Sequence, residues 1–169
     1  MKMYATRPVG LEFLEAAPVR LSFAGTLRAA PGVVFDAVAR DVEALPRWYG
    51  AVAAAEYGGV GVGVGDAGIG VGAKRRVRLV GGVTFHEEVI AWDAPDRYAY
   101  RMERTSVPGI RAMAERWAVV ETSRGTRLVW TIALDAVAGV AAMARAMGPG
   151  LGVATRRAVG RLDRELGEG

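Results

Sequence analysis

The chain has 169 residues and a formal net charge of +4, and 51% of its residues are hydrophobic against 24% that are charged. This balance predicts one folded domain with a sizeable core and excludes a disordered chain. Cysteine is absent, which excludes disulfides, a thiol nucleophile and thiolate metal ligands. No charge-free apolar run reaches the roughly 20 residues of a membrane span. The first residues lack the apolar core of a signal peptide, so we expect a cytoplasmic protein.

The positive charge comes almost entirely from arginine, because Lys2 and Lys74 are the only lysines. The arginines are scattered among 18 acidic residues, and the densest basic group, residues 74–78, lies in a strand-like stretch. Proteins that bind nucleic acid usually gather their basic residues on one face. We therefore expect no nucleic-acid partner.

The first predicted elements are a strand and two short helices. Residues 19–28 alternate apolar and polar side chains, which is typical of a half-buried strand. One helix is predicted to begin at Pro31, because proline suits the first helical position. A second is predicted from Asp41, as N-cap, to an interruption at Pro46.

Alternation with a period of two dominates the chain from residue 73 onward. Its strongest local signal is a hairpin around Gly81 and Gly82, and further strands follow to about residue 135. Residues 137–166 then have helical character, although Gly148-Pro149-Gly150 should break a helix or start one. This order predicts an α+β fold, an antiparallel sheet with helices on one face.

The glycine-rich stretch of residues 58–72 contains Gly63, Gly65 and Gly68 at the G-x-G-x-x-G spacing of a dinucleotide-binding loop. Such a loop needs a helix directly after it, whose N-terminus faces the pyrophosphate. Alternating glycines and a strand-like stretch follow here, so we expect no nucleotide and no other cofactor. The period of two predicts a curved or floppy hairpin, or a mobile gate over a cavity.

Three stretches carry a family resemblance. They are APGVVFDAVARDVEALPRW, which ends in a Pro-x-Trp at Pro46 and Trp48, then GVTFHEEVIAWDAPDRYAYRM, and ERWAVVETSRGTRLVW. Over residues 19–166 the chain resembles the START-like helix-grip superfamily (SRPBCC), and within it the polyketide cyclase/dehydrase-like family. The resemblance implies a curved antiparallel sheet of about seven strands around a long C-terminal helix, with two short helices after the first strand. It implies one such domain over residues 19–169, preceded by an N-terminal extension of residues 1–18.

Strand alternation predicts which side chains face the cavity that this fold implies. If Gly81 and Gly82 form a two-residue turn, Arg75 lies opposite Glu88. The face that carries Trp92 is then the interior one, and a slip of one residue would reverse the assignment. The predicted cavity residues are Trp48, Arg75, Val77, His86, Glu88, Ile90, Trp92, Tyr98, Tyr100, Trp117 and Trp130.

Four polar members of that set, His86, Glu88, Arg75 and Tyr100, are candidates for acid/base catalysis. His86 either moves protons near neutral pH or is a hydrogen-bonded residue of the wall. Arg75 and Glu88 either anchor a polar group of the ligand or form a cross-strand ion pair worth about 0.2–1 kcal/mol. The aromatic residues either stack on a flat ligand or simply pack in the core. A lone histidine and carboxylates without ligand spacing predict no metal site.

Three functions fit these residues and the resemblance. The favoured one is binding of a hydrophobic small molecule, such as a lipid, polyketide or isoprenoid-like compound, as in lipid transport. The second is a polyketide-type aromatase/cyclase or dehydrase that uses polar cavity residues for acid/base chemistry. The third is a protein-interaction module. We expect a monomer or homodimer whose partner is the hydrophobic ligand.

Overall fold

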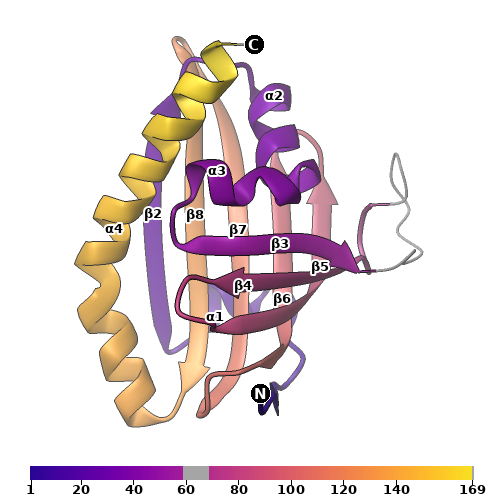
Figure 1. Cartoon of the computed structure of the whole chain (residues 1–169), viewed down its shortest axis with the longest axis vertical. Helices are drawn as coiled ribbons and strands as arrows, with labels where there is room; N and C mark the ends of the chain where they lie inside the picture. The colour runs from indigo at the N-terminus through magenta and orange to yellow at the C-terminus, as the bar shows by residue number, and fades with distance from the viewer. Residues whose placement is uncertain (59–68, 169) are drawn as a thin grey trace.

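The computed structural model describes residues 1–58 and 69–168, and its dominant feature is one curved antiparallel sheet (Figure 1). Its strands are β1 (Tyr4–Ala5), β2 (Val19–Leu27), β3 (Val52–Gly58), β4 (Lys74–Leu79), β5 (Thr84–Asp93), β6 (Arg97–Thr105), β7 (Ile110–Thr122) and β8 (Gly125–Ala136). Seven of them follow the order β2-β8-β7-β6-β5-β4-β3, and β1 pairs separately with β6. In Figure 1, β3 and β4 run across the direction of β7 and β8, which shows how strongly the sheet curls.

The helices divide between the two faces of this sheet. They are α1 (Phe13–Ala16), α2 (Pro31–Phe35), a π-helical turn η1 (Asp36–Arg40), a 3₁₀ turn η2 (Val42–Ala44), α3 (Leu45–Trp48) and α4 (Ala138–Gly167). The main core lies between the inner face of the sheet and the segment α2 to α3 together with α4. This arrangement confirms the predicted α+β helix-grip architecture. No helix in the described part of the chain has both the length and the hydropathy required to span a membrane.

The long helix α4 lies close against β2 because glycine stands at the contact. A Cβ atom added to Gly25 of β2 would lie 2.7 Å from Cγ1 of Val159 on α4, well inside the 3.5–4.0 Å at which carbon atoms pack. Further along the helix, an added Cβ on Gly152 would meet the ring of Phe23 at 3.3 Å. The absence of these side chains lets the sheet grip the helix.

The predicted break at Gly148-Pro149-Gly150 is wrong, because α4 continues through Pro149. An interior proline removes one hydrogen bond and bends a helix, at a cost of about 3 kcal/mol. Figure 1 shows α4 changing direction part-way along its length. Its packing along β2 and the core outweighs the cost of the proline.

The short helices also differ from prediction in their ends. Pro31 occupies the first turn of α2, as predicted. Asp41 makes no side-chain cap, and its carboxylate instead accepts a hydrogen bond from Arg47 at 3.4 Å. Pro46 interrupts nothing, because it lies in the first turn of α3, where a missing N–H costs nothing.

The hairpin between β4 and β5 has a register one residue away from the predicted one. Arg75 pairs with Glu87, because residues 80–82 form a three-residue connection, closed by a 2.8 Å hydrogen bond from Leu79 N–H to the carbonyl of Val83. Both glycines of the connection have φ near +90°, a conformation that favours glycine. The slip moves every side chain of β5 near the turn to the face opposite the predicted one.

A bulge later in β5 changes the alternation again. Val89 and Trp92 both belong to the main core, whereas Ile90 packs against the cluster on the other face. The register between β5 and β6 shifts between Val89 and Ala91. Trp92 therefore faces the interior, as predicted, although the reasoning from simple alternation failed.

Residues 1–18, predicted as an extension, pack on the sheet face opposite α4. Phe13 and Leu14 of α1 are buried there against a group of small residues from β5 to β8, namely Ala91, Ala99, Ala112, Ala114 and Ala133. Because alanine side chains are small, they leave room on the outer surface of the sheet for the two larger side chains of Phe13 and Leu14. The outer face of the sheet is thus a second, smaller core.

The glycine-rich stretch predicted as a hairpin tip or gate falls largely on residues 59–68, outside the described residues. On its two sides β3 and β4 are paired, with Gly58 opposite Lys74. The residues that follow the glycines form strand β4, whereas a dinucleotide loop requires a helix at that point.

Candidate ligand-binding cavity

A cavity of about 190 Å³ lies between the inner face of the sheet, the short helices and α4. Most of its wall is apolar, and six of the aliphatic and thioether side chains are Val52, Val77, Leu79, Met113, Ile132 and Leu151. The alternation of β3, β4, β7 and β8 aims the strand residues of this set inward, and Leu151 belongs to α4. An apolar hollow with few polar groups is the usual form of a small-molecule site.

Three aromatic residues of the wall contact one another through their rings. Trp117 of β7 and Trp130 of β8 are direct cross-strand partners, and their rings stack at 5.3 Å with an angle of 6°. Tyr49, which follows α3, meets the ring of Trp130 edge-on at 5.6 Å. The stack is fixed by the sheet itself, so the cavity has a preformed aromatic wall.

A buried ion pair between Arg75 and Glu87 lies in the same wall. Arg75 Nε is 2.6 Å from Glu87 Oε2, and the two side chains are 4% and 3% exposed. The guanidinium carbon also lies 3.9 Å from the ring centroid of Tyr100, a cation–π contact. Burial by itself would lower the pKa of Arg75. The Glu87 carboxylate and the neighbouring tyrosines raise that pKa by more than burial lowers it, so the arginine remains charged.

Glu115 of β7 is a second buried acid in the wall. Its Oε2 accepts hydrogen bonds from the Tyr100 hydroxyl at 2.6 Å and from Trp130 Nε1–H at 2.8 Å. Its Oε1 has no hydrogen-bond partner among the residues described. Burial, together with the nearby charge of Glu87, raises the pKa of Glu115 to about 7. The cavity therefore holds a buried carboxyl group whose pKa lies close to neutral pH.

Two buried hydroxyl groups near the cavity are unsatisfied. Tyr49 lines the wall with only 7% of its surface exposed, and within the described structure its hydroxyl has no hydrogen-bond partner. Burial raises the pKa of Tyr49 to about 12, an effect that the neighbouring Thr155 partly opposes. Thr155 of α4 is 1% exposed, and the two hydroxyls do not meet in hydrogen-bonding geometry. Unpaired buried hydroxyls are uncommon in folded proteins.

Comparison with known proteins identifies the family of this chain. Residues 19–167 match the family described as polyketide cyclase/dehydrase and lipid transport. The chain belongs to this family. The uncharacterized protein Rv2574 of Mycobacterium tuberculosis is 32% identical over 131 residues, which cover 78% of this chain and 74% of that protein.

Solved structures show the same fold. A START superfamily protein from Mycobacterium smegmatis has a TM-score of 0.63 at 13% identity and covers 88% of this chain and 97% of its own. A protein of Rhodobacter sphaeroides has a TM-score of 0.64 at 16% identity and covers 99% of both chains. These likenesses confirm the fold that the resemblance implied.

The structure brings part of the predicted site together. The predicted residues that line the cavity of this family member are Arg75, Val77, Tyr100, Trp117 and Trp130. Trp48, Trp92 and Tyr98 belong to the surrounding core without lining the cavity. The inward faces of β6, β7 and β8 follow simple alternation, which is why their aromatic residues were found.

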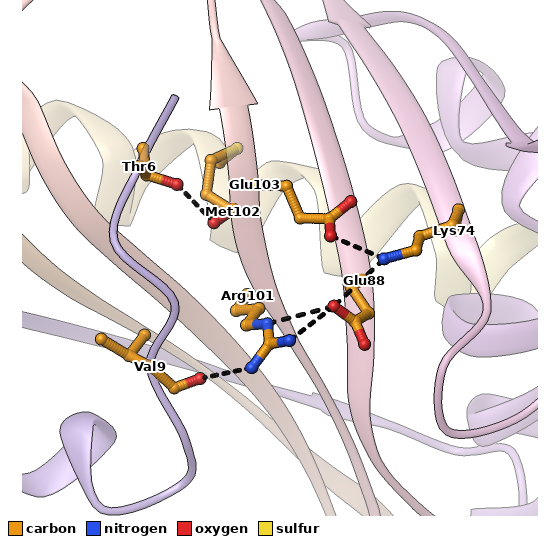
Figure 2. Close-up of polar contacts among 7 residues, drawn as sticks. All are labelled: Thr6, Val9, Lys74, Glu88, Arg101, Met102 and Glu103. Carbon is orange, nitrogen blue, oxygen red and sulfur yellow. Dashed lines mark hydrogen bonds and ion pairs between the residues drawn. The ribbon is translucent and has the colours of Figure 1, made fainter. Parts of the chain in front are cut away.

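The remaining three predicted residues, His86, Glu88 and Ile90, lie on the opposite face of the sheet. Glu88 pairs there with Arg101 at 2.7 Å and with Lys74 at 3.1 Å (Figure 2). Burial raises the pKa of Glu88, but Arg101 and Lys74 lower it more, so the group is charged. The predicted pairing of Arg75 with Glu88 is wrong, because the three-residue connection shifted the register.

This outer network also holds the N-terminal segment in place. Arg101 donates to the carbonyl of Val9 at 3.5 Å, and the Thr6 hydroxyl donates to the carbonyl of Met102 at 2.5 Å (Figure 2). His86 lines a separate hollow of this face beside Met1. Glu88 and His86 therefore belong to the surface that carries residues 1–18 and do not reach the cavity.

Sequence reasoning missed Glu115, Glu87 and Tyr49. Glu115 stands two residues before Trp117 on a strand whose inward face was assigned from that tryptophan, so alternation alone would have found it. Tyr49 follows the last residue of α3, and neither a helical nor a strand pattern of side chains predicts which way it faces. Metal ligation finds no support in the described ranges, where no three histidine or acidic side chains gather.

Proposed function

We propose that the protein binds a hydrophobic small molecule in the cavity between the sheet and α4. The observation that supports this most is the apolar cavity with the stacked rings of Trp117 and Trp130 in its wall. Among the lipid, polyketide and isoprenoid-like ligands expected from the sequence, a volume of about 190 Å³ favours the compact ones. Membership of a family described by cyclisation and lipid transport is consistent with this role.

The test is to look for the ligand and then to fill its site. Native mass spectrometry and organic extraction of the freshly purified protein should reveal a bound apolar compound, and the neutral probe N-phenyl-1-naphthylamine should bind saturably. Leu151→Trp places a large ring in the cavity and should abolish both. Val153→Trp, on an exposed part of the same helix, should leave both unchanged.

The proposal fails if the folded wild-type protein carries no apolar compound and binds no apolar probe. Retention of the ligand by a folded Leu151→Trp variant would place binding elsewhere. Circular dichroism and thermal unfolding of both variants separate loss of binding from loss of fold.

A second candidate function is acid/base catalysis, and Glu115 is the observation that favours it. Its raised pKa, near 7, is suited to a general acid or base at neutral pH, and its Oε1 is free to meet a substrate. Glu115→Gln should then retain ligand binding and lose turnover of whatever compound is extracted. Unchanged turnover in that variant would remove Glu115 from the mechanism.

A further inference from the structure

The outward side of α4 carries few charges for a helix at the surface of a protein. Met143 and Met147 are each 52% exposed, and Arg145 is the only charged residue between Val137 and Thr155. A surface helix normally turns polar and charged side chains toward water. In Figure 1, α4 runs along one edge of the molecule and no other described element lies outside it, so these apolar side chains face solvent.

One stripe along α4 joins this apolar surface to a basic one. Residues spaced alternately by four and three positions recur on the same side of a helix. One such series is exposed at every position and consists of Met143, Met147, Gly150, Ala154, Arg157 and Arg161. The buried residues of α4, among them Ala141, Gly148 and Leu162, lie on the side that packs against the sheet. The outward side is therefore apolar in its first half and basic in its second.

The charge of this helix has a single sign over most of its length. From Ala138 to Leu162 it contains no acidic residue and four arginines, namely Arg145, Arg156, Arg157 and Arg161. The acidic residues that flank this segment are each paired with an arginine from outside the helix, in the pairs Asp135–Arg7, Asp163–Arg28 and Glu165–Arg47. These acids are thus already engaged, and the four arginines keep their positive charge for a partner.

The combination of exposed methionines and unopposed arginines favours one kind of partner. A second copy of the chain would bring the same arginines to the contact and no acidic side chain of this face to pair with them. An anionic bilayer attracts each arginine through its surface potential, and its interfacial layer accepts the apolar side of a helix that lies on the membrane without crossing it. Charge complementarity therefore favours a lipid surface over a dimer.

We propose that the outward side of α4 docks on an anionic lipid bilayer, with Met143 and Met147 in the interfacial layer and the arginines at the headgroups. The inference goes beyond the proposed function, and neither depends on the other. Leu151, which lines the cavity, belongs to the same helix. A protein docked in this way would hold its cavity directly behind the helix that meets the lipid.

The test is cosedimentation of the full-length protein with vesicles of two compositions. One contains equal parts of phosphatidylglycerol and phosphatidylcholine, and the other contains phosphatidylcholine alone. At about 0.1 M salt we expect binding to the anionic vesicles to be at least about tenfold tighter than to the neutral ones. At about 1 M salt this preference should largely disappear, because salt screens the attraction of exposed charges.

Two pairs of substitutions locate the charge on α4. Arg156→Gln with Arg157→Gln should weaken binding to the anionic vesicles about twentyfold, since each arginine near such a surface contributes about fivefold. The matched control is Arg78→Gln with Arg104→Gln, which changes the net charge equally on the opposite face of the sheet. The control protein should bind the anionic vesicles as the wild type does.

The methionines separate insertion into the interface from attraction by charge alone. Met143→Gln with Met147→Gln should weaken binding to the anionic vesicles about tenfold, and glutamine suits an exposed helix, so the fold should be unaffected. Circular dichroism of each variant checks this.

The inference is overturned if the wild type binds neither kind of vesicle or binds both equally. It is also overturned if the arginine or the methionine variant binds as the wild type does. A wild-type dimer in sedimentation velocity that the methionine variant dissolves would assign the face to a second copy instead. Titration with N-phenyl-1-naphthylamine in the absence of vesicles tests the proposed function separately, so that failure of either proposal is recognised without the other.

Discussion

Replacing Arg75 by methionine is expected to lower the free energy of unfolding by about 3–5 kcal/mol. The substitution leaves the Glu87 carboxylate, which is 3% exposed, without its partner in an apolar wall. It also removes the cation–π contact with Tyr100. Chemical denaturation of wild-type and variant protein at pH 7 measures the difference.

Two further variants test whether the loss of stability in Arg75→Met comes from the burial of the ion pair. Arg76→Met breaks an ion pair with Glu56 whose side chains are 59% and 49% exposed, and it should cost no more than about 1 kcal/mol. The double variant Arg75→Met, Glu87→Leu removes both charges and should recover most of the lost stability. Similar costs for Arg75→Met and Arg76→Met would contradict the buried pair.

The stability of the protein is expected to fall as the pH rises from 5 to 8, and Glu115 should account for about 2–3 kcal/mol of the fall. Its pKa is about 7 in the folded protein against 4.5 as a model value. Between these values the folded state holds a proton that the unfolded chain has released. A higher pH therefore favours the unfolded chain, and denaturation at several pH values measures the slope.

Glu115→Gln should flatten much of this slope, since glutamine can still accept the hydrogen bonds of Tyr100 and Trp130 but does not titrate. Burial raises the pKa of Glu87 too, so part of the slope should remain. Glu88 has a lowered pKa, and its contribution is lost only as the pH falls below about 4.5, outside this range. The control is Glu103→Gln, which replaces a carboxylate that pairs with Lys74 on the outer face of the sheet. Equal slopes in wild type and Glu115→Gln would show that Glu115 is not buried as described.

The sequence by itself determined the class of fold and much of the inner surface. Alternation over β6, β7 and β8 is regular, so Tyr98, Tyr100, Trp117 and Trp130 were assigned to the interior by extending the alternation from the face of Trp92. Local pattern suffices there because each strand is long and one of its faces must be buried. The same regularity would have revealed Glu115, the buried acid of the cavity.

Only the tertiary structure decided which acid pairs with Arg75, because one residue more or less in the connection after β4 exchanges Glu87 and Glu88. The sequence pattern around Gly81 and Gly82 is compatible with both lengths. The continuation of α4 through Pro149 likewise depends on packing against β2, which outweighs a local preference. The ring of Tyr49 comes to the cavity wall because the chain turns back after α3, so its contact with Trp130 joins residues that are distant in sequence.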